Sequence, residues 1–264
     1  MTLASASPKV KLMKIGNHCF IVTGGSSGLG HITARHLADR GAQVIVADLQ
    51  SSSQPLPLAC RFIEADVTNP SSAQAVVDFA KREFGGVHGL INCAGVAPAE
   101  KVLGKEGPQR LESFSRTIAV NLIGSFNMLR LVAQAITENP RPQPPDETAG
   151  VIINTASVAA FDGQIGQAAY AASKGGIVGM TLPIARELAR ASIRVMTIAP
   201  GIMATPMLLA FPQDVQDSLN RSVPFPARMG KPEEFARLVA HIIENDYLNG
   251  EVIRLDGAIR MAPR

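Results

Sequence analysis

The chain has 264 residues, of which 46% are hydrophobic and 18% are charged, with a formal net charge of +3. This composition indicates a globular protein with a sizeable core and excludes a disordered chain. The small net charge, without any block of like charges, argues against a nucleic-acid partner, and no run reaches the roughly 18 uncharged apolar residues that a membrane span needs.

Short apolar segments and helical segments alternate along the chain. Residues 1–15 contain lysines but no apolar secretory core, and we expect a flexible tail there. The apolar runs predict strands at 18–22, 43–47, 62–65, 87–91, 151–156, 194–198 and 251–255. Helices are predicted at 31–41, at 71–84 with Ser71 or Ser72 as the cap, at 111–138, from the region of Tyr170 to about 191, and at 232–244.

This alternation predicts the fold class. Continuous apolar strands are typical of a parallel sheet that is covered on both faces. We therefore expect one α/β domain over residues 1–264, a Rossmann-type doubly wound parallel sheet of about seven strands with helices on both faces.

Three connecting segments are distinctive. Residues 98–107 are predicted to form a loop, and the proline-rich stretch at 140–145 cannot be helix interior, so it is expected at the surface. Residues 202–226 contain Met203, Met207, Leu208, Leu209, Phe211 and Phe225. That segment is interpreted as a lid over an apolar substrate, with an amphipathic helix packed on the core as the alternative.

A glycine-rich turn follows the first predicted strand. Its sequence, T-G-G-S-S-G-L-G at 23–30, places Gly24, Gly28 and Gly30 where a helix begins. Glycines let backbone N–H groups approach a pyrophosphate at the positive end of a helix, so a dinucleotide site is predicted, with a plain turn as the alternative. The absence of G-K-[ST] from this turn excludes a P-loop.

Asp48 ends the second predicted strand, in V-I-V-A-D. A carboxylate at that point accepts hydrogen bonds from the adenosine ribose and repels a 2′-phosphate. We therefore predict NAD as the cofactor in preference to NADP. The alternative is that Asp48 caps a loop.

Tyr170 and Lys174 are four residues apart and so share one face of a helix, with about 5–6 Å between their Cβ atoms. A nearby ammonium favours the phenolate form of a tyrosine and would let Tyr170 act as a base nearer neutral pH. Ser157 follows the fifth predicted strand and can return to the same site if the intervening loop is compact. Ordinary surface positions on a helix are the alternative for Tyr170 and Lys174.

These features together resemble the short-chain dehydrogenase/reductase family over nearly the whole chain. The motifs occur in family order: the turn at 23–30, Asp48, Asp66-Val67, N-C-A-G at 92–95, Asn121, Ser157, Y-A-A-S-K at 170–174 and A-P-G at 199–201. Cys93 departs from the usual N-A-G or N-N-A-G, but a small side chain should still fit beside the adenine or ribose. The proline-rich insertion is expected to lie far from the chemistry.

The resemblance implies catalytic roles for four residues. Tyr170 would be the general acid/base, Lys174 would hold the nicotinamide ribose and lower the Tyr170 pKa, and Ser157 would bind the substrate oxygen. Asn121, at a helix kink, would position a proton-relaying water; a plain polar residue inside a helix is the alternative. The implied cofactor contacts are Gly24, Ser26, Ser27, Gly28, Leu29, Gly30, Asp48, Asp66, Val67, Asn92, Cys93, Ala94, Gly95, Tyr170, Lys174, Pro200, Gly201, Met203 and Thr205.

The implied activity is NAD-dependent interconversion of a secondary alcohol and a ketone. Further stretches are most similar to family members that act on 3-hydroxyacyl-CoA, among them 99–107, 161–170 and 223–230. A 3-oxoacyl-carrier-protein reductase, a hydroxysteroid or other alcohol dehydrogenase, and a non-catalytic dinucleotide-binding scaffold are the alternatives. The scaffold is disfavoured because such relatives usually lose the tyrosine or the lysine.

Partners and compartment follow from the same reading. The resemblance implies a homotetramer acting on a small molecule, without nucleic acid or membrane. No metal is expected, because the five histidines form no H-x-x-x-H pair and the chemistry needs none. Three cysteines without C-x-x-C indicate neither disulfides nor zinc, so a reducing compartment is expected: the cytoplasm, or the mitochondrion for a eukaryotic source.

Overall fold

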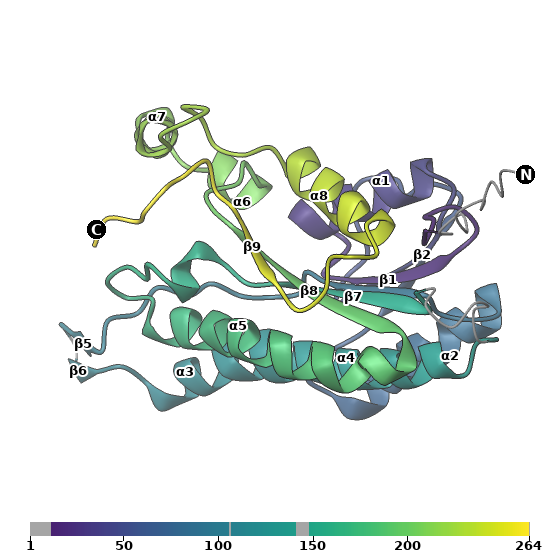
Figure 1. Cartoon of the computed structure of the whole chain (residues 1–264). Helices are drawn as coiled ribbons and strands as arrows, with labels where there is room; N and C mark the ends of the chain where they lie inside the picture. The colour runs from purple at the N-terminus through teal and green to yellow at the C-terminus, as the bar shows by residue number, and fades with distance from the viewer. Residues whose placement is uncertain (1–11, 106, 141–147, 264) are drawn as a thin grey trace, which may run out of the picture.

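A seven-stranded parallel sheet lies at the centre of the computed structural model (Figure 1), which describes residues 12–105, 107–140 and 148–263. The strand order is β3-β2-β1-β4-β7-β8-β9, and every neighbouring pair is parallel. The strands are β1 (Cys19–Thr23), β2 (Gln43–Asp48), β3 (Cys60–Glu64), β4 (Gly89–Asn92), β7 (Gly150–Thr155), β8 (Ile193–Pro200) and β9 (Val252–Leu255). The predicted fold class is confirmed.

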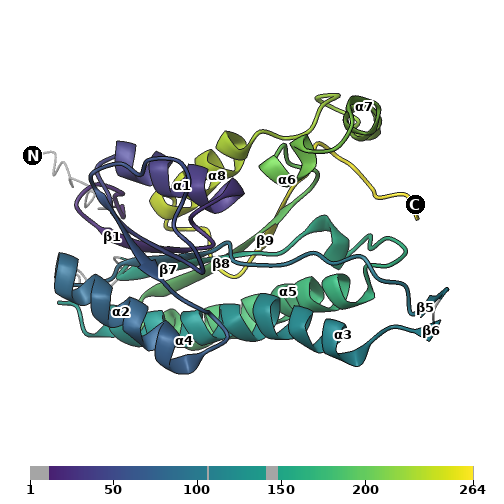
Figure 2. The same cartoon turned by 180° about the vertical axis from the view of Figure 1, so that it is seen from behind.

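Helices cover both faces of the sheet (Figures 1 and 2). On one face lie α1 (Gly28–Asp39), α6 (Pro206–Leu209), α7 (Gln213–Ser222) and α8 (Pro232–Glu244). On the other lie α2 (Pro70–Phe84), α3 (Leu111–Ile118), the π-helical segment η1 (Ala119–Ile123), α4 (Gly124–Thr137) and α5 (Ala168–Leu188). Short 3-10 segments, η2 (Val158–Ala160) and η3 (Ala189–Ala191), precede and follow α5.

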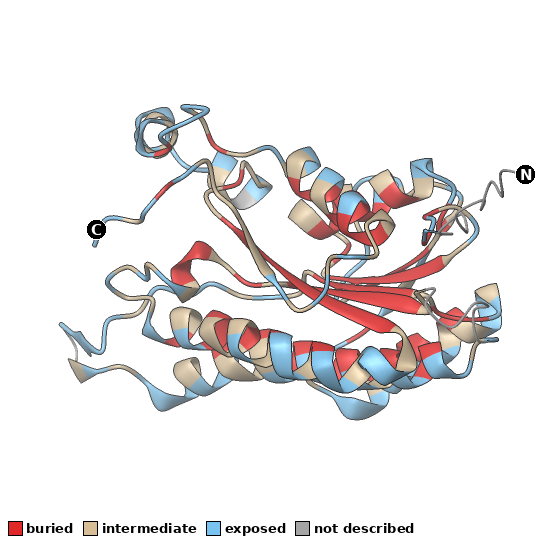
Figure 3. Ribbon diagram, viewed as in Figure 1, coloured by how far each residue is buried: buried red, intermediate tan, exposed pale blue. Residues whose placement is uncertain are grey.

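The strands are buried along their length because both faces are covered (Figure 3). Side chains of a strand alternate between faces, so each strand feeds two cores. Ile21 packs in the core beneath α2, α4 and α5, whereas Phe20 and Val22 pack in the core beneath α1 and α8. This explains the unbroken apolar runs that identified the strands in the sequence.

The predicted single helix at 111–138 is divided in the structure. The π-helical segment Ala119–Ile123 separates α3 from α4 and contains Asn121. Such a widened turn inserts one residue into the helical ladder and is frequent at functional sites.

The combined stretch Leu111–Thr137 is the one helix within the described ranges that is long and apolar enough to cross a membrane, with a mean hydropathy of 1.3. Half of that window, 50%, is buried inside the protein. Its apolar residues Met128, Leu129 and Val132 belong to the core beneath the sheet. The sequence criterion missed this helix because it required an uninterrupted apolar run.

Three local predictions need correction. Residues 12–15 are not a free tail: Met13 and Ile15 are buried, and the Met13 N–H donates to Asp246 at 3.1 Å. Residues 1–11 of the predicted tail, and 141–145 of the proline-rich stretch, lie outside the described residues. The loop at 98–107 contains one strand of a short antiparallel hairpin, β5 (Leu103–Gly104) with β6 (Gly107–Pro108).

The cap of α2 is Asn69, not Ser71 or Ser72. Its side-chain oxygen accepts hydrogen bonds from the backbone N–H groups of Ser71 and Ser72, at 2.9 and 3.0 Å. Pro70 occupies the first helical position, where a backbone N–H would have no helical acceptor, so its missing N–H loses no hydrogen bond. The helix therefore begins before the two serines.

Replacing this cap should destabilise the protein. Asn69→Ala leaves two N–H groups at the end of α2 without a protein acceptor, and we expect a loss of about 1 kcal/mol in the free energy of unfolding. Urea unfolding followed by circular dichroism measures it. Ser71→Ala removes only an exposed hydroxyl and should be nearly neutral; equal losses for both variants would contradict the assignment.

Candidate active site

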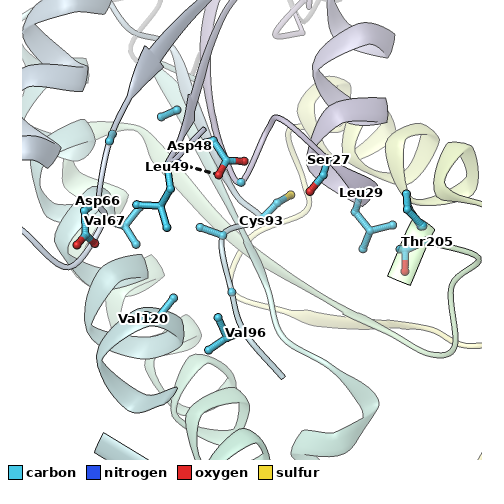
Figure 4. A pocket seen from close by; sticks show the side chains of 18 of the residues that line it. Ser27, Leu29, Asp48, Leu49, Asp66, Val67, Cys93, Val96, Val120 and Thr205 are labelled. Carbon is cyan, nitrogen blue, oxygen red and sulfur yellow. Dashed lines mark hydrogen bonds between the residues drawn. The ribbon is translucent and has the colours of Figure 1, made fainter. Parts of the chain in front are cut away.

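A cavity of about 350 Å³ opens at the carboxyl ends of β1, β2 and β4 (Figure 4). β1 lies between β2 and β4, so the chain winds outward from it in both directions, and ligands of doubly wound sheets bind at such a point. We call this the Asp48 cavity. Its lining includes Gly24, Ser27, Gly28, Leu29, Gly30, Asp48, Asp66, Val67, Cys93, Ala94, Gly95 and Thr205.

The glycine turn lines this cavity, and no larger residue fits at Gly24 or Gly30. Gly24 has φ +63°, and a Cβ on it would lie 2.7 Å from the Ala94 nitrogen. A Cβ on Gly30 would lie 2.2 Å from the Gly24 oxygen. The turn therefore packs backbone against backbone and brings the N-terminus of α1 to the cavity, as a phosphate site requires.

Asp48 is fixed at the mouth of the cavity by two backbone donors. Its Oδ2 accepts from the Ser26 N–H at 3.0 Å. Its Oδ1 accepts from the Leu49 N–H at 2.8 Å (Figure 4). These bonds hold the carboxylate in one orientation and leave further lone pairs for a ligand. Ser26 acts through its backbone and does not line the cavity.

A second cavity, of about 370 Å³, adjoins the first. Ser157, Tyr170 and Lys174 line it, so the structure brings together three of the four predicted catalytic residues, and we call it the Tyr170 cavity. The two cavities share the lining residues Leu29, Cys93, Gly95, Val96 and Thr205. A ligand that extends from Asp48 past these shared residues reaches Ser157, Tyr170 and Lys174.

Lys174 is buried and faces the ring of Tyr170. Its Nζ lies 5.8 Å from the ring centroid and donates to the Thr155 carbonyl at 2.7 Å. Burial lowers the pKa of Lys174 to about 8. The ammonium form is favoured below that pH, although with a smaller margin than in water.

The pKa of Tyr170 moves against the sequence prediction. Burial raises it, because a phenolate is poorly solvated there, and the hydrogen bond with the Ser157 side chain lowers it only in part. Ser157 also accepts from the Ala159 N–H at 3.1 Å, which orients its hydroxyl group. The phenolate of Tyr170 is therefore less favoured in this enclosure than the four-residue spacing alone predicted.

Asn121 lies where the sequence placed it, at the interruption of the long helix, in the π-helical segment Ala119–Ile123. Its side chain is buried: Oδ1 accepts from the Val96 N–H at 2.8 Å, while Nδ2 donates to the Val96 carbonyl at 2.9 Å and to Ser173 at 3.0 Å. These bonds fasten the loop after β4 to the helix that carries Tyr170. The relay of protons through a water stays a prediction for Asn121.

Cys93 lies where the two cavities meet. Burial raises the pKa of its thiol to about 11, while the Thr155 hydroxyl, 3.7 Å from Sγ, and Lys174 lower it. The thiol is therefore neutral at physiological pH and behaves as a small, weakly polar wall.

Most of the predicted cofactor residues reach one of the two cavities, with Pro200, Gly201 and Met203 in the Tyr170 cavity. Asn92 does not: it is buried, and its Nδ2 donates to Asn154 and Ser125. Of the predicted lid residues, Leu208 also lines the Tyr170 cavity, whereas Leu209, Phe211 and Phe225 are exposed.

Several lining residues were missed by the sequence reasoning. Gln164 and Gln167 line the Tyr170 cavity, and their position between Ser157 and Tyr170 could have indicated this. Leu219 and Met261 also line it, and nothing in their local sequence marks them. Arg116 and Val120 of the long helix line the Asp48 cavity. Among the described residues no group of three or more His, Cys, Asp or Glu side chains could hold a metal ion.

Comparison with known proteins defines the class. The family model described as short chain dehydrogenase matches residues 18–216, and the chain belongs to this family. It is therefore an oxidoreductase that uses a nicotinamide dinucleotide, and the glycine turn, the fixed carboxylate and the joined cavities fit such a cofactor.

Individual enzymes are similar to this chain over nearly its whole length. The chain is 54% identical over 250 residues to 3-hydroxyacyl-CoA dehydrogenase type-2 of Bos taurus, covering 92% of this chain and 95% of that protein. The enzyme of the same name from Drosophila melanogaster is 52% identical over 256 residues, covering 94% and 100%. The crystal structure of 3-hydroxyacyl-CoA dehydrogenase type-2 from Mycobacterium avium superposes with a TM-score of 0.87 at 37% identity, covering 95% of this chain and 99% of that one.

Tyr170→Phe should remove nearly all turnover, by at least about a hundredfold, because it deletes the proton that the reaction transfers. Binding of the reduced dinucleotide, followed by fluorescence titration, should be unchanged. Tyr247 is the only other tyrosine and is fully exposed, so Tyr247→Phe is the matched control and should retain full activity. Turnover that survived in Tyr170→Phe would remove this residue from the chemistry.

Lys174→Met should shift the pH dependence of alcohol oxidation. The ammonium favours the phenolate, so its loss raises the pKa of Tyr170 further, and the rise in kcat with pH should move to higher pH. Lys174→Arg keeps the charge and should keep more of the original profile. A Lys174→Met profile that coincided with that of the wild type would show that the lysine does not tune the tyrosine.

Proposed function

We propose that this protein is an NAD-dependent dehydrogenase that interconverts a 3-hydroxyacyl-CoA and the corresponding 3-oxoacyl-CoA. The observation that carries the proposal is the junction of the two cavities at Cys93 and Gly95, beside Lys174 and Tyr170. A dinucleotide that follows the glycine turn would end where the proton-transferring side chains stand. The printed names of the relatives support the acyl-CoA substrate.

In the oxidation direction, the Tyr170 phenolate, formed by release of its proton to solvent, accepts the proton of the substrate alcohol and becomes the neutral phenol. Lys174 stabilises the phenolate that accepts this proton, and the Thr155 carbonyl holds the ammonium in place. Ser157 donates a hydrogen bond to the substrate oxygen as its charge changes. The nicotinamide, when bound, supplies the acceptor for the hydride. In reduction, Tyr170 returns the proton.

The choice of NAD rests on Asp48. A carboxylate held by two backbone N–H groups is suited to accept hydrogen bonds from the ribose hydroxyls and cannot swing away from a 2′-phosphate. Arg116 is the one cation in the described lining of the Asp48 cavity, which also contains the carboxylate of Asp66. This balance of charge also favours a cofactor without the extra phosphate.

Asp48→Ala should lower kcat/KM for NADH by about tenfold to a hundredfold, the value of one or two hydrogen bonds to a charged group. The ratio of NADPH to NADH activity should rise, because the repulsion is removed. Glu64 ends the neighbouring strand in register with Asp48 but does not line the cavity, so Glu64→Ala is the control. A wild-type preference for NADPH would contradict the proposal.

The substrate class is tested by following NADH oxidation with acetoacetyl-CoA beside 3-oxoacyl-carrier-protein, apolar ketones and 3-ketosteroids. We expect the highest kcat/KM with acyl-CoA thioesters. The Tyr170 cavity has apolar walls from Met203, Leu208 and Leu219 and polar amides from Gln164 and Gln167, which suit a chain with a polar head. A higher kcat/KM with steroids or with the carrier-protein thioester would assign the site to one of those substrates.

We also propose a homotetramer. Large apolar side chains are exposed on the outer surface of η1, α4 and α5, among them Ile123 at 54%, Phe126 at 47% and Leu182 at 44%. A patch of this kind is typical of a protein–protein interface, and in this family the corresponding helices pair between subunits.

Phe126→Glu should therefore reduce the tetramer to dimers, because it places a charge inside the proposed interface. Light scattering after size-exclusion chromatography measures the mass. Leu58 is more exposed, at 96%, but lies in the loop before β3, so Leu58→Glu should leave the mass unchanged. A wild-type protein that eluted as a monomer would contradict the proposed assembly.

A reducing compartment is proposed for the protein. Cys19, Cys60 and Cys93 are free, and burial raises the pKa of Cys19 to about 12 and that of Cys60 to about 11. Neutral buried thiols of this kind pack as small apolar residues. The proposed location is the cytoplasm, or the mitochondrion if the source is eukaryotic.

A further inference from the structure

The chain end lies against the loop that leads from Ser157 to α5. After β9, the yellow C-terminal segment in Figures 1 and 2 runs on the side of α6 and α7. The Pro263 carbonyl accepts from the Ile165 N–H at 3.0 Å, and the Ala262 carbonyl accepts from the Gln164 side chain, also at 3.0 Å. Two hydrogen bonds therefore join the end of the described chain to a loop whose residue Gln164 lines the Tyr170 cavity.

An arginine clasp fixes the start of the same segment. Arg254 donates from Nη2 to Asp162 at 2.8 Å and from Nε to Asp256 at 2.7 Å, and Nη2 also reaches the Ile259 carbonyl at 3.1 Å. Its guanidinium lies 5.1 Å from the centroid of the Phe161 ring. The side chains of Arg254 and Asp162 are only 22% and 24% exposed, so solvent screens this pair less than an ordinary surface pair.

Met261 lies between these two fastenings. Ile259, two residues before it, is buried at 2% exposure, and Ala262 and Pro263 after it are hydrogen-bonded to the loop. Met261 lines the Tyr170 cavity together with Leu208 and Leu219 of the α6–α7 region. One wall of the cavity thus comes from the last residues of the chain, which sequence position alone would assign to a loose end.

We propose that Met261 is a specificity-determining residue that limits the length of the acyl chain, and that the Arg254–Asp162 pair is a positioning device that holds it there. The inference rests on the proposed function and deepens it. The apolar, unbranched side chain of Met261 would contact an acyl chain in this cavity, and changes of its rotamer would make only limited room for that chain. Removing the side chain lengthens the space available to the substrate.

Steady-state kinetics test the first part. The ratio of kcat/KM for 3-oxododecanoyl-CoA to that for acetoacetyl-CoA should rise about tenfold in Met261→Ala, because a few methylene groups in an apolar pocket carry such differences. Met180 is a half-buried methionine of α5 that does not line the cavity, so Met180→Ala is the matched control and should keep the wild-type ratio. An unchanged ratio in Met261→Ala would overturn the proposal.

A second measurement does not depend on turnover. The chain contains no tryptophan, so Met261→Trp introduces a unique fluorophore into the proposed wall. Adding NADH and then a long-chain methyl ketone should quench its emission and shift it to the blue. Tyr247→Trp, at a fully exposed position, should show no shift. Equal responses of the two variants would overturn the proposal. A blue shift in a protein that fails to turn over any acyl-CoA would instead refute the proposed substrate alone.

The clasp is tested by Arg254→Met, which should raise the same chain-length ratio as Met261→Ala while leaving NADH affinity unchanged. Arg254→Lys keeps a charge opposite Asp162 and should restore part of the wild-type ratio. Arg40 makes a comparable two-bond pair with Glu244, at 2.9 and 3.0 Å, away from the cavity, so Arg40→Met is the control. Lower thermal stability in Arg254→Met with an unchanged ratio would show that the pair is merely structural.

Discussion

The burial of the Lys174 ammonium is the constraint on which the active site depends. A charged group taken out of water is costly unless a partner receives it, and here the carbonyl of Thr155 at the end of β7 does so. The hydrogen bond from Lys174 to Thr155 connects α5 to the central sheet one helical turn from Tyr170. The lowered Lys174 pKa and the raised Tyr170 pKa are two effects of the same enclosure.

The loop after β4 completes this arrangement. The Asn121 side chain accepts a hydrogen bond from the Val96 N–H and donates one to the Val96 carbonyl. Its third hydrogen bond, to Ser173, links that loop to α5. Asn121 belongs to the π-helical segment Ala119–Ile123, which separates α3 from α4. Asn121 therefore connects the wall of the dinucleotide cavity to the helix that carries Tyr170, in addition to the proton-relay role predicted for it.

The sequence predicted the sheet and its covering helices because these depend on local periodicity, and it paired Tyr170 with Lys174 because both lie on one helix at a fixed spacing. The place of Ser157 came from the family resemblance, since a loop separates it from that helix. Prediction from the sequence failed where contacts join distant segments. Met13 is anchored by Asp246, and Met261 faces a cavity assembled from loops far away in the chain. The direction of the Tyr170 pKa was also missed, since burial is a property of the folded environment and not of the four-residue spacing.

The two ends of the described chain lie in different places relative to the Tyr170 cavity. Met13 is fastened beside Asp246, near the end of α8, whereas Pro263 is bonded to Ile165 at the rim of the catalytic side. An affinity tag or a fluorescent partner fused after the last residues would start beside the loop whose residue Gln164 lines the Tyr170 cavity. Recombinant versions intended for enzymology are therefore better extended at the amino terminus.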